Sequence, residues 1–304
     1  MVRYVAGRDI HDFRKKMHVT QKKLAYGICS ISTLSRIESG EQMPARKLAE
    51  ALLTRLGQPP QLYDLPLTRD EYLRNILEVQ MSRSLSLGTG ELTDLLKAYR
   101  EIPTEPDLLE KQHYLCLKTI DDALHGLSPD KAFASFLETI RISIPGFELT
   151  YDLDAYLFSW VEQLCINNMA FSLYDMGNIG ETGRCTEFLK AYYERTPMNE
   201  YEKGNNLIGA IFNLTNWTGI SGDIARALAL AEEGIPHCVR YGNLHFFYLN
   251  FYNKGFSLAS LGRKEEGKEY VSFALDMLRE SGAKDLHLYV DDANTLFDNC
   301  FTEG

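Results

Sequence analysis

The side chains of this chain that could take part in specific chemistry are polar and cationic residues close to its amino terminus. The stretch TQKKLAYGICSISTLSRIESG (20–40) places Gln, Lys, Ser and Arg between regularly spaced apolar residues. An arginine can donate two hydrogen bonds to a guanine edge, a serine can bond to either base type, and an apolar side chain can pack on a thymine methyl. These residue types indicate contacts with the edges of DNA bases.

Short helices must position these side chains. The segment RDIHDFRKKM has one apolar and one basic face, which predicts a first helix. Thr20 and Ser30 are suitable N-caps for a second and a third helix, and Gly40 is a suitable end for the third. Pro44 opens a fourth helix, which Gly57 closes.

The third helix has a polar outer surface. Leu34 and Ile37 are three residues apart and should face the interior. That leaves four residues around the outside: Ile31, Ser32, Ser35 and Arg36. This arrangement of two short helices joined by a tight turn is typical of a DNA-binding motif. The second helix, with its small polar face, enters the major groove.

The motif TQKKLA…SxSTLSRIESG…P resembles the helix-turn-helix of the Cro/Xre repressor family over about residues 6–57. The turn is one residue shorter than in the usual phage repressors, and Cys29 stands where a turn glycine is often found. This short form looks like the variant carried by Rgg-type regulators. The resemblance places Ile31, Ser32 and Arg36 at base-facing positions.

We therefore expect a DNA-binding set on the second, third and fourth helices. Gln21, Lys22 and Lys23 lie at the amino end of the second helix, where N–H groups and positive charge favour a phosphate. Arg46 and Lys47 open the fourth helix and are expected phosphate contacts too. The full set is Gln21, Lys22, Lys23, Ser30, Ile31, Ser32, Thr33, Ser35, Arg36, Arg46 and Lys47. Two alternatives remain: Ile31 could belong to the core, and the two lysines could form only a solvated face.

Charge is distributed unevenly along the 304 residues. Residues 1–66 carry 11 Lys and Arg against 6 Asp and Glu, whereas residues 67–304 carry 21 against 36. A basic head on an acidic body suggests that the head meets a polyanion and the body does not. We expect two domains, a DNA-binding head with its linker (1–66) and a helical body for ligand sensing and dimerisation (67–304).

The body shows a repeated pattern of helix pairs. Gly177, Gly222 and Gly262 lie between helices at spacings of 45 and 40 residues, and each is followed five positions later by a small residue. The last unit, FYNKGFSLASLGRKEEGKEYVSFAL, resembles a tetratricopeptide repeat. The expected fold is all-α: the head followed by a right-handed superhelix of such pairs. The alternative is a helical bundle without repeats.

Asparagines recur in register within these pairs. Asn168, Asn213 and Asn253 each lie nine residues before one of the aligned glycines. First helices of such pairs line the concave surface, where an amide can donate to and accept from an extended peptide backbone. The expected peptide-binding set is Asn167, Asn168, Phe171, Asn213, Asn216, Asn250, Tyr252 and Asn253. The alternative is that each Asn bonds a neighbouring helix within the stack.

This architecture is similar to the Rgg/PlcR/PrgX group of peptide-sensing regulators. The resemblance implies a homodimeric transcription regulator that binds a DNA operator and a short peptide. Because the amino terminus MVRYVAGRDIHDFRKK has no apolar core of a signal peptide, we expect a cytoplasmic protein. The alternative is a regulator whose body binds a protein partner or only dimerises.

Other classes of function find little support in the sequence. The six cysteines are scattered without a C-x-x-C pair, no histidine stands at ligand spacing, and we expect neither a metal nor another cofactor. No nucleophile–base pair or phosphate loop indicates an enzyme, and Glu162, Glu187 and Glu194 are expected to face solvent. Apolar stretches are far shorter than the ~20 residues that span a bilayer, so no membrane partner is expected.

Overall fold

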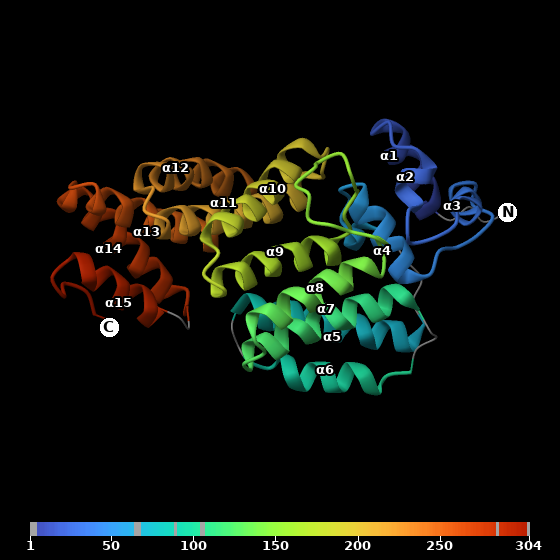
Figure 1. Cartoon of the computed structure of the whole chain (residues 1–304), viewed down its shortest axis with the longest axis horizontal. Helices are drawn as coiled ribbons and strands as arrows, with labels where there is room; N and C mark the ends of the chain where they lie inside the picture. Colours follow the sequence, from blue (N-terminus) through green and yellow to red (C-terminus); the bar gives the residue numbers. More distant parts are fainter. Residues whose placement is uncertain (1–4, 64–67, 88–89, 104–106, 284–285, 303–304) are drawn as a thin grey trace. The chain divides into compact units, whose positions relative to one another are not determined.

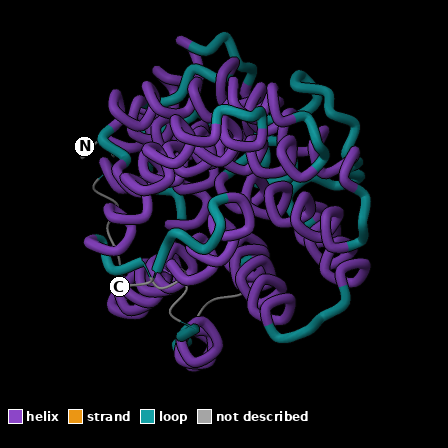
Figure 2. The backbone as a smooth tube through the Cα atoms, turned by 90° about the vertical axis from the view of Figure 1, so that its left-hand side faces the viewer, coloured by secondary structure: helices purple, strands orange, loops and turns teal. Residues whose placement is uncertain are grey.

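The computed structural model describes residues 5–63, 68–87, 90–103, 107–283 and 286–302. Within these ranges every regular element is a helix and none is a strand (Figures 1 and 2). None of the described helices is long and apolar enough to cross a membrane. The all-α expectation is therefore confirmed.

The head contains the four expected helices. They are α1 (Val5–Lys16), α2 (Gln21–Ala25), α3 (Ile31–Glu38) and α4 (Arg46–Arg55). The Thr20 hydroxyl accepts a hydrogen bond from Lys23 N at 3.1 Å, and the Ser30 hydroxyl accepts one from Thr33 N at 3.0 Å. Both predicted N-caps are thus confirmed. The caps fix where α2 and α3 begin, and so which side chains α3 turns outward.

An apolar core holds these four helices together. Its fully buried members are Ile10, Leu24, Ala25, Leu34, Ile37, Leu52, Leu53 and Leu56. Leu34 and Ile37 face inward as their spacing predicts. Gly40 follows α3 with a φ of +76°, a conformation that glycine adopts without strain.

Contacts divide the chain into two compact units. The first comprises residues 1–178 and 195–199, and the second comprises 179–194 and 200–304. The predicted boundary between residues 66 and 67 lies outside the described residues. The head therefore shares its compact unit with the helices that follow it.

Five further α-helices complete the first unit. After the short 3-10 helix η1 (Pro60–Leu62) come α5 (Arg69–Leu87), α6 (Leu92–Glu101), α7 (Leu108–Leu124), α8 (Pro129–Arg141) and α9 (Trp160–Asp175). Neighbours in the chain from α5 to α9 pack on one another, as Figure 1 shows. Helix α4 of the head packs on α7 and α9.

The second unit is a stack of helix pairs. Its elements are α10 (Ile179–Arg195), α11 (Glu200–Ile220), α12 (Ile224–Tyr241), α13 (Leu244–Ser260), α14 (Lys264–Glu280) and α15 (Leu286–Leu296). Gly222 and Gly262 join α11 to α12 and α13 to α14 with φ values of +91° and +87°. A methyl group built on Gly267 would lie 2.4 Å from the carbonyl oxygen of Gly255, so these small residues allow α13 and α14 to touch.

Candidate functional site

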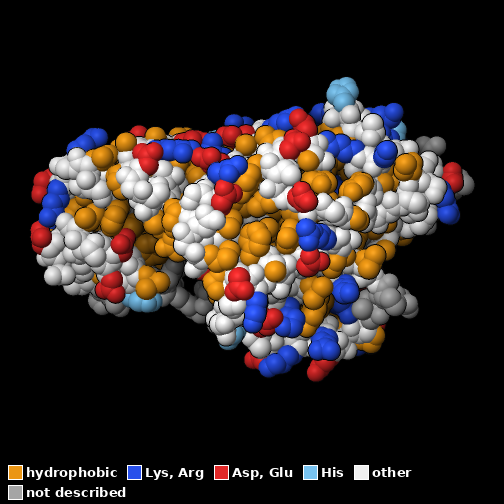
Figure 3. All heavy atoms as spheres, viewed as in Figure 1, with side chains coloured by type: hydrophobic (Ala, Val, Ile, Leu, Met, Phe, Trp, Pro, Cys, Tyr) orange, Lys and Arg blue, Asp and Glu red, His pale blue; other side chains and the backbone are white. Residues whose placement is uncertain are grey.

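The outer surface of α3 is accessible. Ser32, Ser35 and Arg36 are exposed, and Ile31 is 49% exposed. The alternative that Ile31 belongs to the core is therefore wrong. Lys and Arg side chains are visible over the head in Figure 3.

A chain of hydroxyl groups orders the first turn of α3. The Ser30 hydroxyl lies 2.8 Å from the hydroxyls of both Ser32 and Thr33. Because a hydroxyl both donates and accepts, Ser32 can exchange this bond for one to a base edge while Ser30 keeps its cap. Ser30 and Thr33 thus shape the turn behind Ser32.

A buried ion pair fixes α3 against α1 and α2. Arg14 donates from Nε to Glu38 Oε1 at 2.5 Å and from Nη2 to Glu38 Oε2 at 2.6 Å. Gln21 Nε2 also donates to Glu38, at 2.8 Å. Burial would raise the pKa of Glu38, but the hydrogen bonds from Arg14 and Gln21 outweigh it and lower that pKa. The Gln21 side chain therefore positions α2 on α3 in this structure.

The lysines of α2 differ from each other. Lys22 is exposed, whereas the Lys23 ammonium donates to the backbone oxygen of Asp154 at 3.0 Å. Lys22 is thus available to a phosphate without rearrangement, whereas the Lys23 ammonium is already held by the Asp154 carbonyl with one of its three donors.

Arg46 and Lys47 are buried at the opening of α4, with exposures of 4% and 7%. Arg46 Nη2 lies 2.5 Å from Glu78 Oε1, and the Lys47 ammonium lies 3.0 Å from Glu78 and from Glu50. Burial would raise the pKa of Glu78, but Lys47, His113 and Arg46 hold it well below its usual range. This placement speaks against the predicted phosphate contacts, because carboxylates already neutralise both cations.

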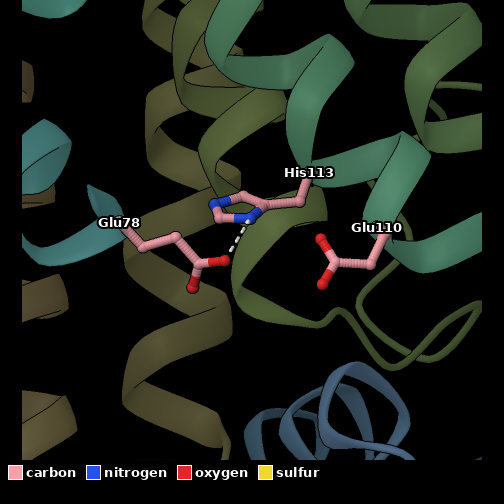
Figure 4. Close-up of side chains that lie close together, drawn as sticks. All are labelled: Glu78, Glu110 and His113. Carbon is pink, nitrogen blue, oxygen red and sulfur yellow. Dashed lines mark ion pairs between the residues drawn. The ribbon is translucent and has the colours of Figure 1, made fainter. Parts of the chain in front are cut away.

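Glu78, Glu110 and His113 point toward one another beside this network (Figure 4). Their ligand atoms lie within 4.8 Å of one another, a spacing that a metal ion could use. However, Arg46 and Lys47 contact Glu78, and Arg74 Nη1 lies 3.6 Å from Glu110. Because these three cations already surround the carboxylates, the cluster is an ion-pair network and we do not propose it as a metal site.

Helix α9 carries the first part of the predicted peptide-binding set. Asn167 and Asn168 are half-buried, and Phe171 is 39% exposed. Asn168 Nδ2 donates to the Leu164 carbonyl of its own helix at 2.8 Å. These residues belong to the first compact unit, whereas Asn213 and Asn253 belong to the second.

The amides of the second unit fall into two groups. Asn213, Asn216 and Asn253 are half-buried, and Asn253 Nδ2 donates to Asn216 Oδ1 at 2.7 Å, which links α13 to α11. Asn250 is fully buried, and a methyl group built on Gly234 would lie 2.6 Å from its Oδ1. The in-stack alternative therefore describes Asn250, and it also describes the Asn253–Asn216 bond.

Tyr252 is buried as well. Its hydroxyl lies 2.8 Å from the Tyr289 carbonyl oxygen and 3.0 Å from Asp292 Oδ2, and burial raises its pKa. Tyr252 and Asn250 are therefore core residues of the stack, which speaks against direct contact with a peptide.

Several structurally important residues escaped the sequence reasoning. Glu162, expected to face solvent, is fully buried and pairs with Arg55, so that expectation is wrong. Arg14 and Glu38 were not singled out either. These two residues lie 24 positions apart, so no local pattern in the sequence joins them.

Comparisons with known proteins agree with this architecture. A family model described as helix-turn-helix matches residues 10–63, and no curated protein matches the chain significantly. Bacillus thuringiensis PlcR in complex with the peptide PapR7 and DNA is 17% identical over 94% of this chain and 97% of that one, with a TM-score of 0.59. The apo form of PlcR is 16% identical over 92% and 98%, with a TM-score of 0.58.

A weaker likeness is to the apo competence regulator ComR from Streptococcus vestibularis, 13% identical over 98% of each chain with a TM-score of 0.47. The family match confirms the helix-turn-helix head. The PlcR structures show that this chain shares their fold, a helix-turn-helix followed by a helical-repeat body.

Proposed function

We propose that this protein is a sequence-specific, DNA-binding transcription regulator whose helical-repeat body senses a short peptide. The observation that carries the DNA part is the exposed outer surface of α3, with Ile31, Ser32 and Arg36, on a head that matches the helix-turn-helix family. We place its action in the cytoplasm, where the operator is.

Each exposed residue of α3 has a distinct role in this proposal. Arg36 donates two hydrogen bonds to a guanine edge, Ser32 bonds to a base of either type, and Ile31 packs on a thymine methyl. Lys22 contacts a phosphate, and Ser35 borders the same surface. One head makes few base contacts, so specific binding requires a homodimer on a two-fold operator.

The peptide part rests on the half-buried amides and on the shared fold. One of the similar PlcR structures holds a peptide together with DNA. In the second unit of this chain, Asn213, Asn216 and Asn253 lie on α11 and α13, and an amide can hold an extended backbone from both sides. Binding through Asn253 requires its Nδ2 to exchange Asn216 for a peptide carbonyl. On α9, Asn168 and Phe171 are further candidates, with Asn167 beside them.

The experiment begins with the full-length protein and a library of randomised duplexes, from which the operator is selected. Short peptides, including those encoded beside the gene, are then titrated while operator binding and dimer mass are followed. Asn213→Ala and Asn253→Ala should weaken the peptide response by about tenfold, the equivalent of one or two lost hydrogen bonds. Asn205→Ala is the matched control, because Asn205 is exposed on the same helix as Asn213.

A second candidate function follows from the Asn253–Asn216 bond, which shows two of these amides satisfied within the stack. In that case the body binds a protein partner or only dimerises. Unchanged operator binding with every peptide, together with wild-type behaviour of both alanine variants, would favour this candidate and reject the peptide sensor.

A further inference from the structure

Buried ion pairs join helix α4 of the head to helices of the body. Helix α4 carries three cations, Arg46, Lys47 and Arg55, and all three are buried. A basic residue in a DNA-binding head is expected to face the polyanion. Here each of the three instead meets a carboxylate of the helices that follow the head.

Arg55 lies at the centre of one attachment. Its Nη1 donates to the carbonyls of Leu24 and Tyr26 at 3.1 and 2.7 Å, which holds the end of α2. Its Nη2 donates to Glu162 Oε1 at 3.1 Å. The guanidinium therefore joins the helix-turn-helix to the body.

Glu162 is itself held rigidly. It is fully buried at the start of α9, where its Oε2 accepts from Ser159 N at 2.5 Å in a capping box. Its Oε1 also accepts from the Ser143 hydroxyl at 2.5 Å. Next to it, Trp160 N donates to the Thr54 hydroxyl of α4 at 3.2 Å. The first turn of α9 therefore contacts α4 through both Trp160 and Glu162.

Glu78 of α5 forms the second attachment. It binds both Arg46 and Lys47, and Arg46 Nη1 also donates to Asn75 Oδ1 at 3.0 Å. The hydroxyl of Tyr99 on α6 lies 2.8 Å from Glu78 Oε1 and 2.5 Å from Glu110 Oε2, and its single proton can be donated to only one of the two carboxylates at a time. We call Arg46, Lys47 and Arg55, with Glu78 and Glu162, the α4 clamp.

The clamp resists movement of the head because of burial. Turning α4 away from α5 and α9 would leave buried charges without partners, and breaking a buried pair costs far more than breaking a surface pair. The head should therefore move together with α5–α9.

We propose that the α4 clamp makes the head one rigid body with helices α5–α9, so that the body fixes the spacing between the two DNA half-sites that a dimer can occupy. This inference rests on the proposed function. Once one head of the dimer is bound, a rigidly held second head lies at high effective concentration near its half-site only when the spacing matches. A loosened head reaches half-sites at several spacings, but it binds at the best spacing less tightly. Glu78 and Glu162 are then positioning residues for operator choice, although neither lies on the outer surface of α3.

The test compares full-length wild type with two single variants, Glu162→Gln and Glu78→Gln. Each removes one carboxylate charge from the body and leaves the α3 surface unchanged. Binding is measured to duplexes with one selected half-site and to duplexes with two half-sites separated by a series of spacers. Glu202→Gln is the matched control, since Glu202 is a half-buried carboxylate of the second unit that accepts from Asn206 Nδ2 at 3.4 Å.

We expect wild type and Glu202→Gln to prefer one spacing sharply. Each clamp variant should bind a single half-site with wild-type affinity, lose about tenfold in affinity at the best two-site spacing, and accept neighbouring spacings better. Two results would overturn the proposal. One is a wild-type spacing preference in both variants, and the other is an equal loss of affinity for one and two half-sites, which would indicate only a damaged fold.

A measurement without DNA tests the α4 clamp independently of the proposed DNA-binding function. Hydrogen exchange in the clamp variants should accelerate in α4 relative to α11 and α13 of the same molecules. If wild type selects no duplex, the proposed function fails, and the exchange data still decide whether the clamp exists. Uniform exchange in variants and wild type would reject it.

Discussion

Arg36 and Arg55 belong to the same small head and have opposite roles. Arg36 is exposed on α3 and is proposed to read a base, whereas Arg55 is buried and holds α2 to α9. Their difference comes from position on a helix: the outer surface of α3 faces solvent, and α4 faces the body. For single residues, the sequence therefore predicts well what a side chain can do chemically. It predicts whether that side chain is exposed or buried only where the spacing of apolar residues shows which face of the helix is buried.

Replacing Arg36 by Ala should reduce operator affinity while leaving the fold intact. One bidentate base contact contributes about 1–3 kcal/mol of discrimination, so affinity should fall by roughly 5- to 150-fold per head. Fluorescence anisotropy with the selected operator and with non-specific duplex measures this loss. Arg36→Lys is the control: it keeps the charge and the non-specific affinity but loses discrimination, because an ammonium lacks the planar fork. Unchanged operator affinity in Arg36→Ala would refute the assignment.

The ionisation of Glu78 should make the free energy of unfolding depend on pH in the acidic range. Its pKa is held well below the usual 4.5 in the folded state, so its stabilising contribution is complete above about pH 4.5 and is lost as the pH falls through the lower folded pKa. Glu78→Gln should lower the free energy of unfolding at pH 7 by about 3 kcal/mol and flatten its dependence on pH below 4.5.

Denaturant titrations of both proteins at pH 7 and pH 3.5 measure these changes. Glu187→Gln is the control, since Glu187 pairs with Arg226 on an exposed surface and should matter little. Parallel pH profiles for wild type and Glu78→Gln would show that Glu78 carries no such linkage.

At the scale of elements, local signals were the reliable ones. Thr20 and Ser30 cap their helices as predicted, because a cap depends on residues within one turn. The burial of Arg46 and Lys47 could not be foreseen, since their partner Glu78 lies about thirty residues further along the chain. Asn250 and Asn253 are one turn apart on α13, yet one is fully buried and the other half-buried. Register along the sequence gives their spacing, but only the packing of α12 and α11 decides which amide is enclosed.

The contact between α13 and α14 should depend on Gly267. Its missing side chain lets the helices approach, because a methyl group there would lie 2.4 Å from the Gly255 carbonyl oxygen. Gly267→Ala should therefore destabilise the protein by about 1–3 kcal/mol, the usual cost of overpacking. Thermal melting measures it against Gly183→Ala, where a methyl group meets nothing within 4 Å inside α10. Gly183→Ala should instead stabilise the protein by about 0.5–1 kcal/mol, because alanine has a higher helix propensity than glycine. Equal melting temperatures for both variants would contradict the close-packing argument.

At the scale of the whole molecule, the head has less positive charge available to a polyanion than its count of Lys and Arg residues suggests. Residues 1–66 carry a net excess of five positive charges. However, Arg46, Lys47 and Arg55 are neutralised by carboxylates of α4, α5 and α9, and Arg14 is neutralised by Glu38. The charge asymmetry agrees with the helix-turn-helix match of the head, but part of the positive charge joins the head to the body.

This distribution predicts a modest salt dependence of operator binding to which Lys22 contributes directly. Each phosphate contact adds about 0.9 to the slope of log affinity against log salt concentration, so Lys22→Ala should reduce the slope of a dimer by about 2. Sequence preference should not change, because a phosphate contact carries no base information. Anisotropy titrations from low to physiological salt give the slope, and Lys97→Ala on the exposed surface of α6 is the control that should leave it unchanged. If Lys22→Ala kept the wild-type slope, the amino end of α2 would not lie on the DNA backbone, and the docking of α3 in the major groove would have to be revised with it.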